Sequence, residues 1–426
     1  MRNGLVNLCC VVGCLGVLAA AQSAPVPRLS LAQALQQARA NSARFEAAVA
    51  TAAIAKAGTS VARAGLLPSA NFLGSYLYTQ GNRYIANNAV HEYTSQGDVH
   101  ESLGFGSLAT VSKAQAAAAF ATAQAQIAGR GLNAVVTADY YTLVSAGDEV
   151  TTAQLALSDA QKYLHISQEL ENGGEVAHSD VIKADLQVEQ SQRDLRQAHL
   201  AAQQARLQLA VLLFPRFNEN FTLVDDLAAT PGLPAFARVQ AMAHGHNPIL
   251  AAAQANVNEA RQDVVIARAG MLPALTLDYT YGIDAAQFAV RNELGLPNLG
   301  SSATAALTIP IFDWGARRAQ LQQSHLLQKE AATQLSFTRR QLEGQLRSFY
   351  AEAQAAKGEL ATLARSRQLA AESLRLSALR YKDGEATIIE LVDAEIANAA
   401  ARNAYDTGLV RYHVALAQLK TLTGPF

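Results

Sequence analysis

Proline is confined to a few short segments of this 426-residue chain. None of its eleven prolines lies between Pro68 and Pro215, and none lies between Pro310 and Pro425. A proline inside a helix costs about 3 kcal/mol or more, so a long helix has to exclude it. The two proline-free stretches, rich in Ala, Gln and Leu, therefore predict long helices, and the prolines mark the joints between them.

The second half of the chain repeats the first. The segment 62–68 (ARAGLLP) recurs at 267–273 (ARAGMLP) with one difference, and Gly174-Glu175 recurs as Gly384-Glu385, 210 residues later. A period of half the chain indicates an internal two-fold repeat of a large unit rather than a solenoid of short ones.

Both halves predict the same order of elements. In the first half a helix over about 30–66 precedes a β-hairpin at 69–104, a long helix at 106–171 and a returning helix at 178–213. The second half predicts the corresponding elements at 238–271, 274–310, 315–382 and 386–422. A helix of about 65 residues spans roughly 98 Å, which a globular domain does not need. The two short helices of each half match that length only when they are stacked end to end.

The chain divides into four segments on this basis. They are a signal peptide (1–21), a first structural repeat (22–213), a linker (214–237) and a second structural repeat (238–426). In the signal peptide, Arg2 precedes an apolar run at 5–18, and small residues at 19–21 offer a cleavage site. Cys14 loosely fits a lipidation box, so a lipoprotein stays an open alternative. All three cysteines lie here, so we expect a mature chain without disulfides or a thiol catalyst.

The hairpin of the second half has the pattern of strands that face lipid on one side. Apolar and polar residues alternate over 275–281 and again over 302–309, as is typical of membrane barrels. The strand containing Phe72 and Tyr76 fits less well, and the one near 92–104 is weak. Four strands cannot close a barrel, and lipid does not tolerate an open edge. Several chains must therefore contribute four strands each, and three chains would give twelve.

These features, in this order, resemble the outer membrane efflux protein family, the TolC type. The segment 309–315 (IPIFDWG) is the most specific, because Pro310, Phe312, Asp313, Trp314 and Gly315 resemble the second strand-to-helix junction of the family. The corresponding segment of the first half, 101–106, lacks the Pro-x-Phe-Asp element, so the boundary of the second strand stays open. Trp314 is either an anchor at the membrane interface or a residue buried where strands and helices meet.

The resemblance implies a mostly α-helical protein with a small β-barrel contribution. Three protomers would form a long α-helical barrel of coiled-coil hairpins, joined to a 12-stranded β-barrel by four transmembrane strands from each. It implies a homotrimer in the cell outer membrane with a periplasmic extension, in contact with outer-membrane lipid. It also implies a periplasmic adaptor (membrane fusion) protein and an inner-membrane transporter, which would pass drugs, metals or proteins to this exit duct of a tripartite efflux or type I secretion system. No cofactor is implied.

The resemblance places a periplasmic gate where the second long helix turns back, at Gly384. Glu390 and Asp393 match the ring-forming acids of the family, and their i, i+3 spacing puts both on one side of the helix. Three copies would place them around a pore and favour cations. The alternative is two solvated acids that stabilise a helix N-terminus. Arg380 and Tyr381 either brace the closed tip by hydrogen bonds or simply pack there.

The first half lacks a second acid at the equivalent place. Asp180 and Lys183 occupy the positions of Glu390 and Asp393, so we expect no second ring and a pairing role for these two residues.

Other functional classes find little support. With 16% charged residues and a net charge of -1, the chain has no basic footprint for nucleic acid. We find no Ser/His/Asp set, paired carboxylates or zinc spacing, so we expect no enzyme and no metal site. His244 and His246 are interpreted as solvated residues on a loop before a helix. A soluble periplasmic coiled-coil scaffold would explain the helices but not the tyrosine-rich hairpins.

Overall fold

The computed structural model describes residues 27–79, 91–218 and 220–426, so the expected signal peptide and Cys14 lie outside the described residues. The elements run in chain order as β1 (Arg28–Leu29), α1 (Leu31–Asn41), α2 (Ala43–Ala64), β2 (Ser69–Tyr78), β3 (His91–Leu103), α3 (Ser107–Asn172), α4 (His178–Leu213), β4 (Thr222–Leu223), α5 (Phe236–His246), α6 (Pro248–Ala269), β5 (Ala274–Ala285), β6 (Leu299–Thr308), α7 (Ala316–Lys382) and α8 (Ile388–Thr423). The order α2-β2-β3-α3-α4 recurs as α6-β5-β6-α7-α8, as the sequence predicts.

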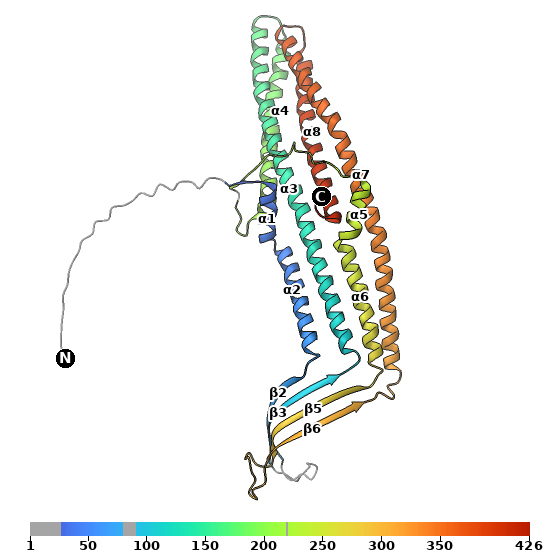
Figure 1. The fold of residues 1–426 in the computed structure, drawn as a ribbon. Helices are drawn as coiled ribbons and strands as arrows, with labels where there is room; N and C mark the ends of the chain where they lie inside the picture. Colours follow the sequence, from blue (N-terminus) through green and yellow to red (C-terminus); the bar gives the residue numbers. More distant parts are fainter. Residues whose placement is uncertain (1–26, 80–90, 219) are drawn as a thin grey trace, which may run out of the picture.

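The helices lie side by side in a single layer (Figure 1). α3 and α7, of 66 and 67 residues, run along the whole layer, roughly 100 Å at 1.5 Å per residue. The shorter helices divide this length between them. α2 and α4 each lie along a different half of α3, and α6 and α8 each lie along a different half of α7. A layer one helix deep leaves both faces uncovered. No residue of α2 is buried, and its Ile54 and Val61 are 71% and 73% exposed.

The single helices predicted at 30–66 and 238–271 are wrong, because each is broken. α2 starts anew after Ser42, whose Oγ accepts the Phe45 N–H at 3.3 Å. α6 starts anew at Pro248, and Asn247 Oδ1 accepts the Ile249 N–H at 2.8 Å. Pro248 lacks the N–H that a continuous helix requires, and a Ser or Asn cap stabilises a new helix start.

Asparagines at the two breaks join the short helices end to end. Asn41 Nδ2 donates to the Leu213 carbonyl at 2.6 Å, and Asn247 Nδ2 donates to the Leu422 carbonyl at 3.0 Å. Both carbonyls belong to the last turn of a returning helix, where no intrahelical donor is available. Each asparagine therefore satisfies a carbonyl that has no donor within its helix. Asn41 connects the α1–α2 break to the end of α4, and Asn247 connects the α5–α6 break to the end of α8.

The linker between the two halves crosses the middle of the helix layer and is held there by side chains of the long helices. Its strand β4 pairs in parallel with β1. The Tyr140 O–H of α3 donates to the Val224 carbonyl at 2.6 Å, and the Tyr350 O–H of α7 donates to the Pro234 carbonyl at 3.1 Å. The linker has little secondary structure of its own, so these bonds fix its path.

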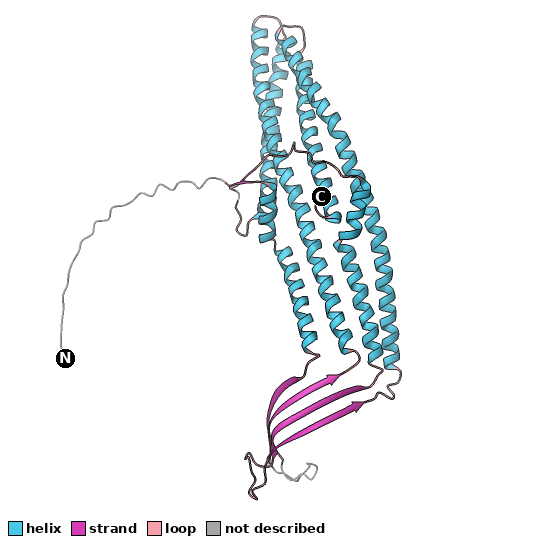
Figure 2. Ribbon diagram, viewed as in Figure 1, coloured by secondary structure: helices cyan, strands magenta, loops and turns pink. Residues whose placement is uncertain are grey.

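The strands form one antiparallel sheet at the end of the helix layer, in the order β2-β3-β5-β6 (Figure 2). β3 pairs with β5 from Tyr93 opposite Ala285 to Leu103 opposite Leu275, which joins the two hairpins. Apolar and polar residues alternate only weakly along β3, but polar residues of β3 lie opposite polar residues of β5. In one such pair, His100 Nδ1 lies 2.6 Å from Asp278 Oδ1. β2 and β6 are the edge strands, and every residue of both is exposed.

Among the described residues, no helix has the length and apolar character needed to cross a membrane.

We expect Tyr140→Phe to lower the free energy of unfolding by about 1 kcal/mol, because the variant leaves a partly buried linker carbonyl without its donor. Guanidinium unfolding in detergent, followed by circular dichroism, measures this. Tyr405→Phe is the control, since no hydrogen bond of its hydroxyl is found within the described residues. Equal stability of Tyr140→Phe and the unmodified protein would show that this bond does not hold the linker.

Candidate functional site

Two similar turns form the end of the helix layer that is remote from the sheet (Figure 1). After α3, Gly174 has a φ of +78° and the Glu175 N–H donates to the Leu170 carbonyl at 2.9 Å. After α7, Gly384 has a φ of +74° and the Glu385 N–H donates to the Arg380 carbonyl at 2.8 Å. This left-handed helix end favours glycine, because a Cβ would collide with the backbone.

An apolar cluster packs the four helices together at this tip. Its buried members are Ala184 of α4, Tyr381 of α7, and Ile388 and Leu391 of α8, and partly buried residues of α3 pack against them. Tyr381 is 1% exposed, and its hydroxyl lies 2.6 Å from Ser167 Oγ of α3. Burial raises the pKa of Tyr381, so the hydroxyl keeps its proton and can donate. Tyr381 thus connects the second long helix to the first.

The predicted gate acids lie at the start of α8, on its exposed side. Thr387 Oγ1 accepts the Glu390 N–H at 3.3 Å and so caps the helix. Glu390 and Asp393 are exposed, whereas Leu391 between them is buried. Arg380 Nη1 lies 3.4 Å from Glu390 Oε2, and Arg380 Nη2 donates to the Glu385 carbonyl at 3.0 Å. The structure therefore brings Arg380 and Glu390 together across the turn, with Asp393 one turn further along α8.

The equivalent place in the first half is neutralised within its own helix. Lys183 Nζ lies 3.1 Å from Asp180 Oδ1 on α4, which confirms the expected pairing. The two turns thus share a backbone shape but differ in the charge that they expose.

The predicted strand-to-helix junction connects β6 to α7. Asp313 Oδ1 accepts the Gly315 N–H at 3.1 Å and Oδ2 accepts the Arg317 N–H at 3.0 Å, so Asp313 caps the long helix. Gly315 has a φ of +84°. Phe312 and Trp314 stack edge to face at 4.9 Å, and Trp314 is 91% exposed. Trp314 is therefore not buried by its own chain at the joint between strands and helices, which was one of its two interpretations. Pro310 lies at the start of this junction, just after the end of β6 at Thr308.

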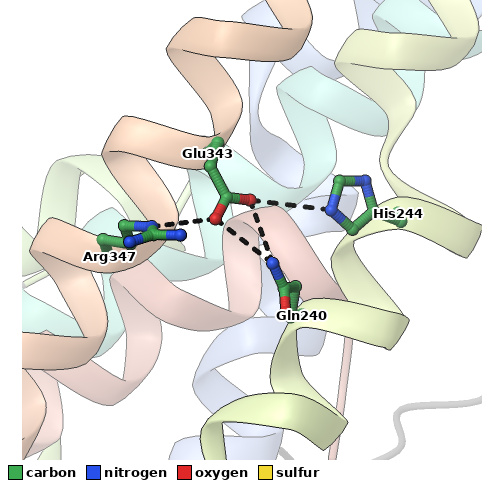
Figure 3. Close-up of polar contacts among 4 residues, drawn as sticks. All are labelled: Gln240, His244, Glu343 and Arg347. Atoms are coloured by element: carbon green, nitrogen blue, oxygen red, sulfur yellow. Dashed lines mark hydrogen bonds and ion pairs between the residues drawn. The ribbon is translucent and has the colours of Figure 1, made fainter.

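His244 and His246 lie in the last turn of α5, so the prediction of a loop was wrong. The helix continues to Asn247, where the break described above begins. His244 Nε2 lies 3.6 Å from Glu343 Oε2 of α7, and the same carboxylate accepts hydrogen bonds from Arg347 Nε at 2.8 Å and Gln240 Nε2 at 3.2 Å (Figure 3). The hydrogen bond from Arg347 lowers the pKa of Glu343, as do Gln240 and His244. This cluster connects α5 to α7.

Among the described residues, no group of three or more His, Cys, Asp or Glu side chains is arranged to hold a metal ion.

Comparison with known proteins relates the second half of the chain to a known family. Residues 240–425 match the family model described as "Outer membrane efflux protein". This match covers 186 of the 426 residues, so the second half of the chain is similar to that family. The proteins to which the chain is similar are named as outer-membrane proteins or outer-membrane channels.

Solved channels show that the TolC-like fold extends over nearly the whole chain. The CmeC outer membrane channel of Campylobacter jejuni is 17% identical with a TM-score of 0.77, and the similarity covers 92% of this chain and 85% of that one. The open state of the MtrE outer membrane channel of Neisseria gonorrhoeae is 21% identical with a TM-score of 0.75, covering 92% and 88%. The outer membrane protein VceC of Vibrio cholerae is 19% identical with a TM-score of 0.77, covering 93% and 96%.

A curated relative is similar over a shorter region. The pyoverdine export outer membrane protein OpmQ of Pseudomonas putida is 27% identical over 191 residues, which span 45% of this chain and 40% of OpmQ. The chain thus matches less than half the length of this curated relative.

Two residues of the tip escaped the sequence analysis. Ser167, the partner of Tyr381, lies inside a long helix with no motif around it. Thr387 could have been found, because Thr-x-x-Glu before an apolar run is a sequence signal for a helix start.

We expect Gly384→Ala to lower the free energy of unfolding by about 1–2 kcal/mol, because alanine is strained in the left-handed conformation. Thermal unfolding in detergent measures the effect. Gly344→Ala is the control: this glycine lies inside α7 with open space around a Cβ, so the same change should stabilise by about 0.5–1 kcal/mol. Destabilisation of both variants to the same extent would contradict the role of the turn.

Proposed function

We propose that the chain is one protomer of a homotrimeric exit duct of a tripartite efflux or type I secretion system. The observation that supports this most directly is the joining of a helix layer of roughly 100 Å to a four-stranded sheet with two open edges. The helices are long enough to cross the periplasm, and the sheet has an apolar, tyrosine-rich face that suits lipid.

Closure of the sheet sets the number of chains. An edge strand within lipid has unpaired backbone groups, which are costly there. β2 of one protomer can pair with β6 of the next, and three protomers would supply twelve strands. The uncovered faces of α2 and α7 would pack against neighbouring copies or line the interior.

Glu390 and Asp393 would form the gate at the remote end. Three-fold symmetry would bring two exposed carboxylates from each chain around the narrow end of the tunnel, where they would attract cations. Arg380 would brace the closed tip through Glu390, and Tyr381 would brace it through Ser167. The open state named for the MtrE channel supports the idea that such tips move.

Cargo would arrive through a periplasmic adaptor protein from an inner-membrane transporter. The pyoverdine export named for OpmQ favours the efflux of a small molecule over protein secretion. Passage would be passive, because the family supplies a conduit.

We expect the protein extracted from outer membranes to have the mass of three chains in detergent. Light scattering with correction for bound detergent measures this, and boiling before electrophoresis should give single chains. A single-chain mass before heating would contradict the trimer.

We expect Glu390→Gln combined with Asp393→Asn to weaken block by a trivalent cation by about tenfold, because the carboxylates that hold the cation are gone. Conductance in planar bilayers, with the cation added on the periplasmic side, gives the concentration for half block. Asp180→Asn is the matched control, since this acid occupies the equivalent position and is paired with Lys183. Unchanged block in the double variant would exclude the ring.

A further inference from the structure

A buried carboxylate lies on α8 just beyond the proposed gate acids. Glu395 is 3% exposed, and neither of its carboxylate oxygens has a hydrogen-bond partner among the described residues. Asn398 Oδ1, three residues further along the same helix, also lacks a partner there. Buried acceptors without donors are costly, and an ionised carboxylate is the costliest of them.

These groups border a cavity of about 340 Å³ between α3, α7 and α8. The charged or titratable side chains around it are Asp159 and Tyr163 from α3, Arg375 from α7, and Glu395 and Arg402 from α8. Asp159 pairs with Lys162 at 2.8 Å, and Arg375 pairs with Glu372 at 2.7 Å. The guanidinium of Arg375 and the carboxylate of Asp159 thus already have partners on their own helices.

Protonation of Glu395 lowers the cost at this position, because it removes the buried charge and supplies a donor for one of the unpartnered acceptors. A neutral carboxyl gains an O–H donor, and Asn398 Oδ1 lies at the i+3 position, which faces the same side of the helix. Burial, and then the negative charge of Asp159, raise the pKa of Glu395 to about 7. Above that pH the ionised group would face the Asp159 carboxylate across the contact between α3 and α8.

That contact joins the two halves of the chain close to the tip, since α3 and α8 belong to different halves and both pack in the tip cluster. We propose that Glu395 is a proton-binding site that allows α3 and α8 to pack closely when it is protonated and loosens their contact when it is ionised, so that the tip opens more readily as the pH rises through neutrality. This inference rests on the proposed gate.

The site belongs to the second half of the chain alone. Ala184-Asp185 stands 210 residues before Ala394-Glu395, and both alanines are buried, but Asp185 is exposed. Asp185 is therefore a carboxylate at the equivalent position that is not buried, and it provides a matched control for Glu395.

A second acid, which is partly buried, lies further along the same contact. Asp148 borders an adjoining cavity of about 500 Å³, and burial, followed by Asp225 and Asp406, raises its pKa to about 6. The two acids are told apart by substitution, because a step caused by Asp148 is lost in Asp148→Asn and a step caused by Glu395 is lost in Glu395→Gln.

The open fraction of single channels in planar bilayers tests the proposal across this pH range. For the unmodified protein, we expect it to rise with a midpoint near pH 7. Glu395→Gln should keep the low open fraction of acid pH and lose this step, while Asp185→Asn should behave like the unmodified protein. Asp159→Asn should move the midpoint to lower pH, because a repelling charge is removed. A step near pH 7 that persists in Glu395→Gln would overturn the proposal.

Unfolding measured against pH gives an independent readout of the proton site. The folded-state pKa of Glu395 is raised, so its contribution is fully present below the unfolded value near 4.5 and is lost as the pH rises to about 7. Glu395→Gln should remove this decline. If the decline persists, the site does not bind the proton; if it disappears while the conductance step persists, the coupling to opening is wrong. The cation-block experiment on Glu390 and Asp393 is separate, so failure of the gate and failure of this inference are distinguishable.

Discussion

The open edges of β2 and β6 determine most of what this chain has to do. A four-stranded sheet with an apolar face cannot lie in lipid while its edge backbone groups are unpaired, and it is too small to close on itself. The helices carry the same constraint, because a layer one helix deep has no interior of its own. The largest buried cluster lies where the linker crosses the layer, another lies at the tip, and a small one lies between α6 and α7. In the proposed trimer, further copies of the chain would supply what both parts of the molecule lack.

Within one chain, specific polar contacts keep the layer in register. Asn41 and Asn247 connect the short helices end to end, and Tyr140 and Tyr350 hold the linker across the layer. At the tip, Tyr381 connects the two long helices. The two turns differ in charge, because Glu390 pairs with Arg380 and Asp393 stands exposed beside it, whereas Lys183 occupies the position of Asp393 in the first half and pairs with Asp180.

The sequence predicted the elements that local rules control. The returning helix at 178–213 has the predicted bounds, because a glycine turn precedes it and Pro215 closely follows it. The break at Ser42 escaped prediction, since a serine cap without a following proline carries a weak local signal. The strand β3 was weakly indicated because its polar residues pair with those of β5, a neighbour more than 170 positions away in the chain.

The candidate site divides in the same way. The family motif identified Glu390, Asp393 and the junction residues, and the structure places them at a helix start and at a strand-to-helix joint. Ser167 and Glu395 carry no such signal, because their importance comes from the helix that packs opposite them. Spacing along α8 shows that Glu395 follows the gate acids, but it does not show that α3 covers it with Asp159 nearby.

Disulfide cross-linking between edge strands tests the central claim most directly. The native cysteines all lie before residue 15, so single cysteines can be introduced along β2 and β6 and oxidised in the outer membrane. The account predicts that facing pairs join up to three chains and then stop, because the third chain closes the ring. Absence of cross-links at every register, or a ladder that continues beyond three chains, would contradict it.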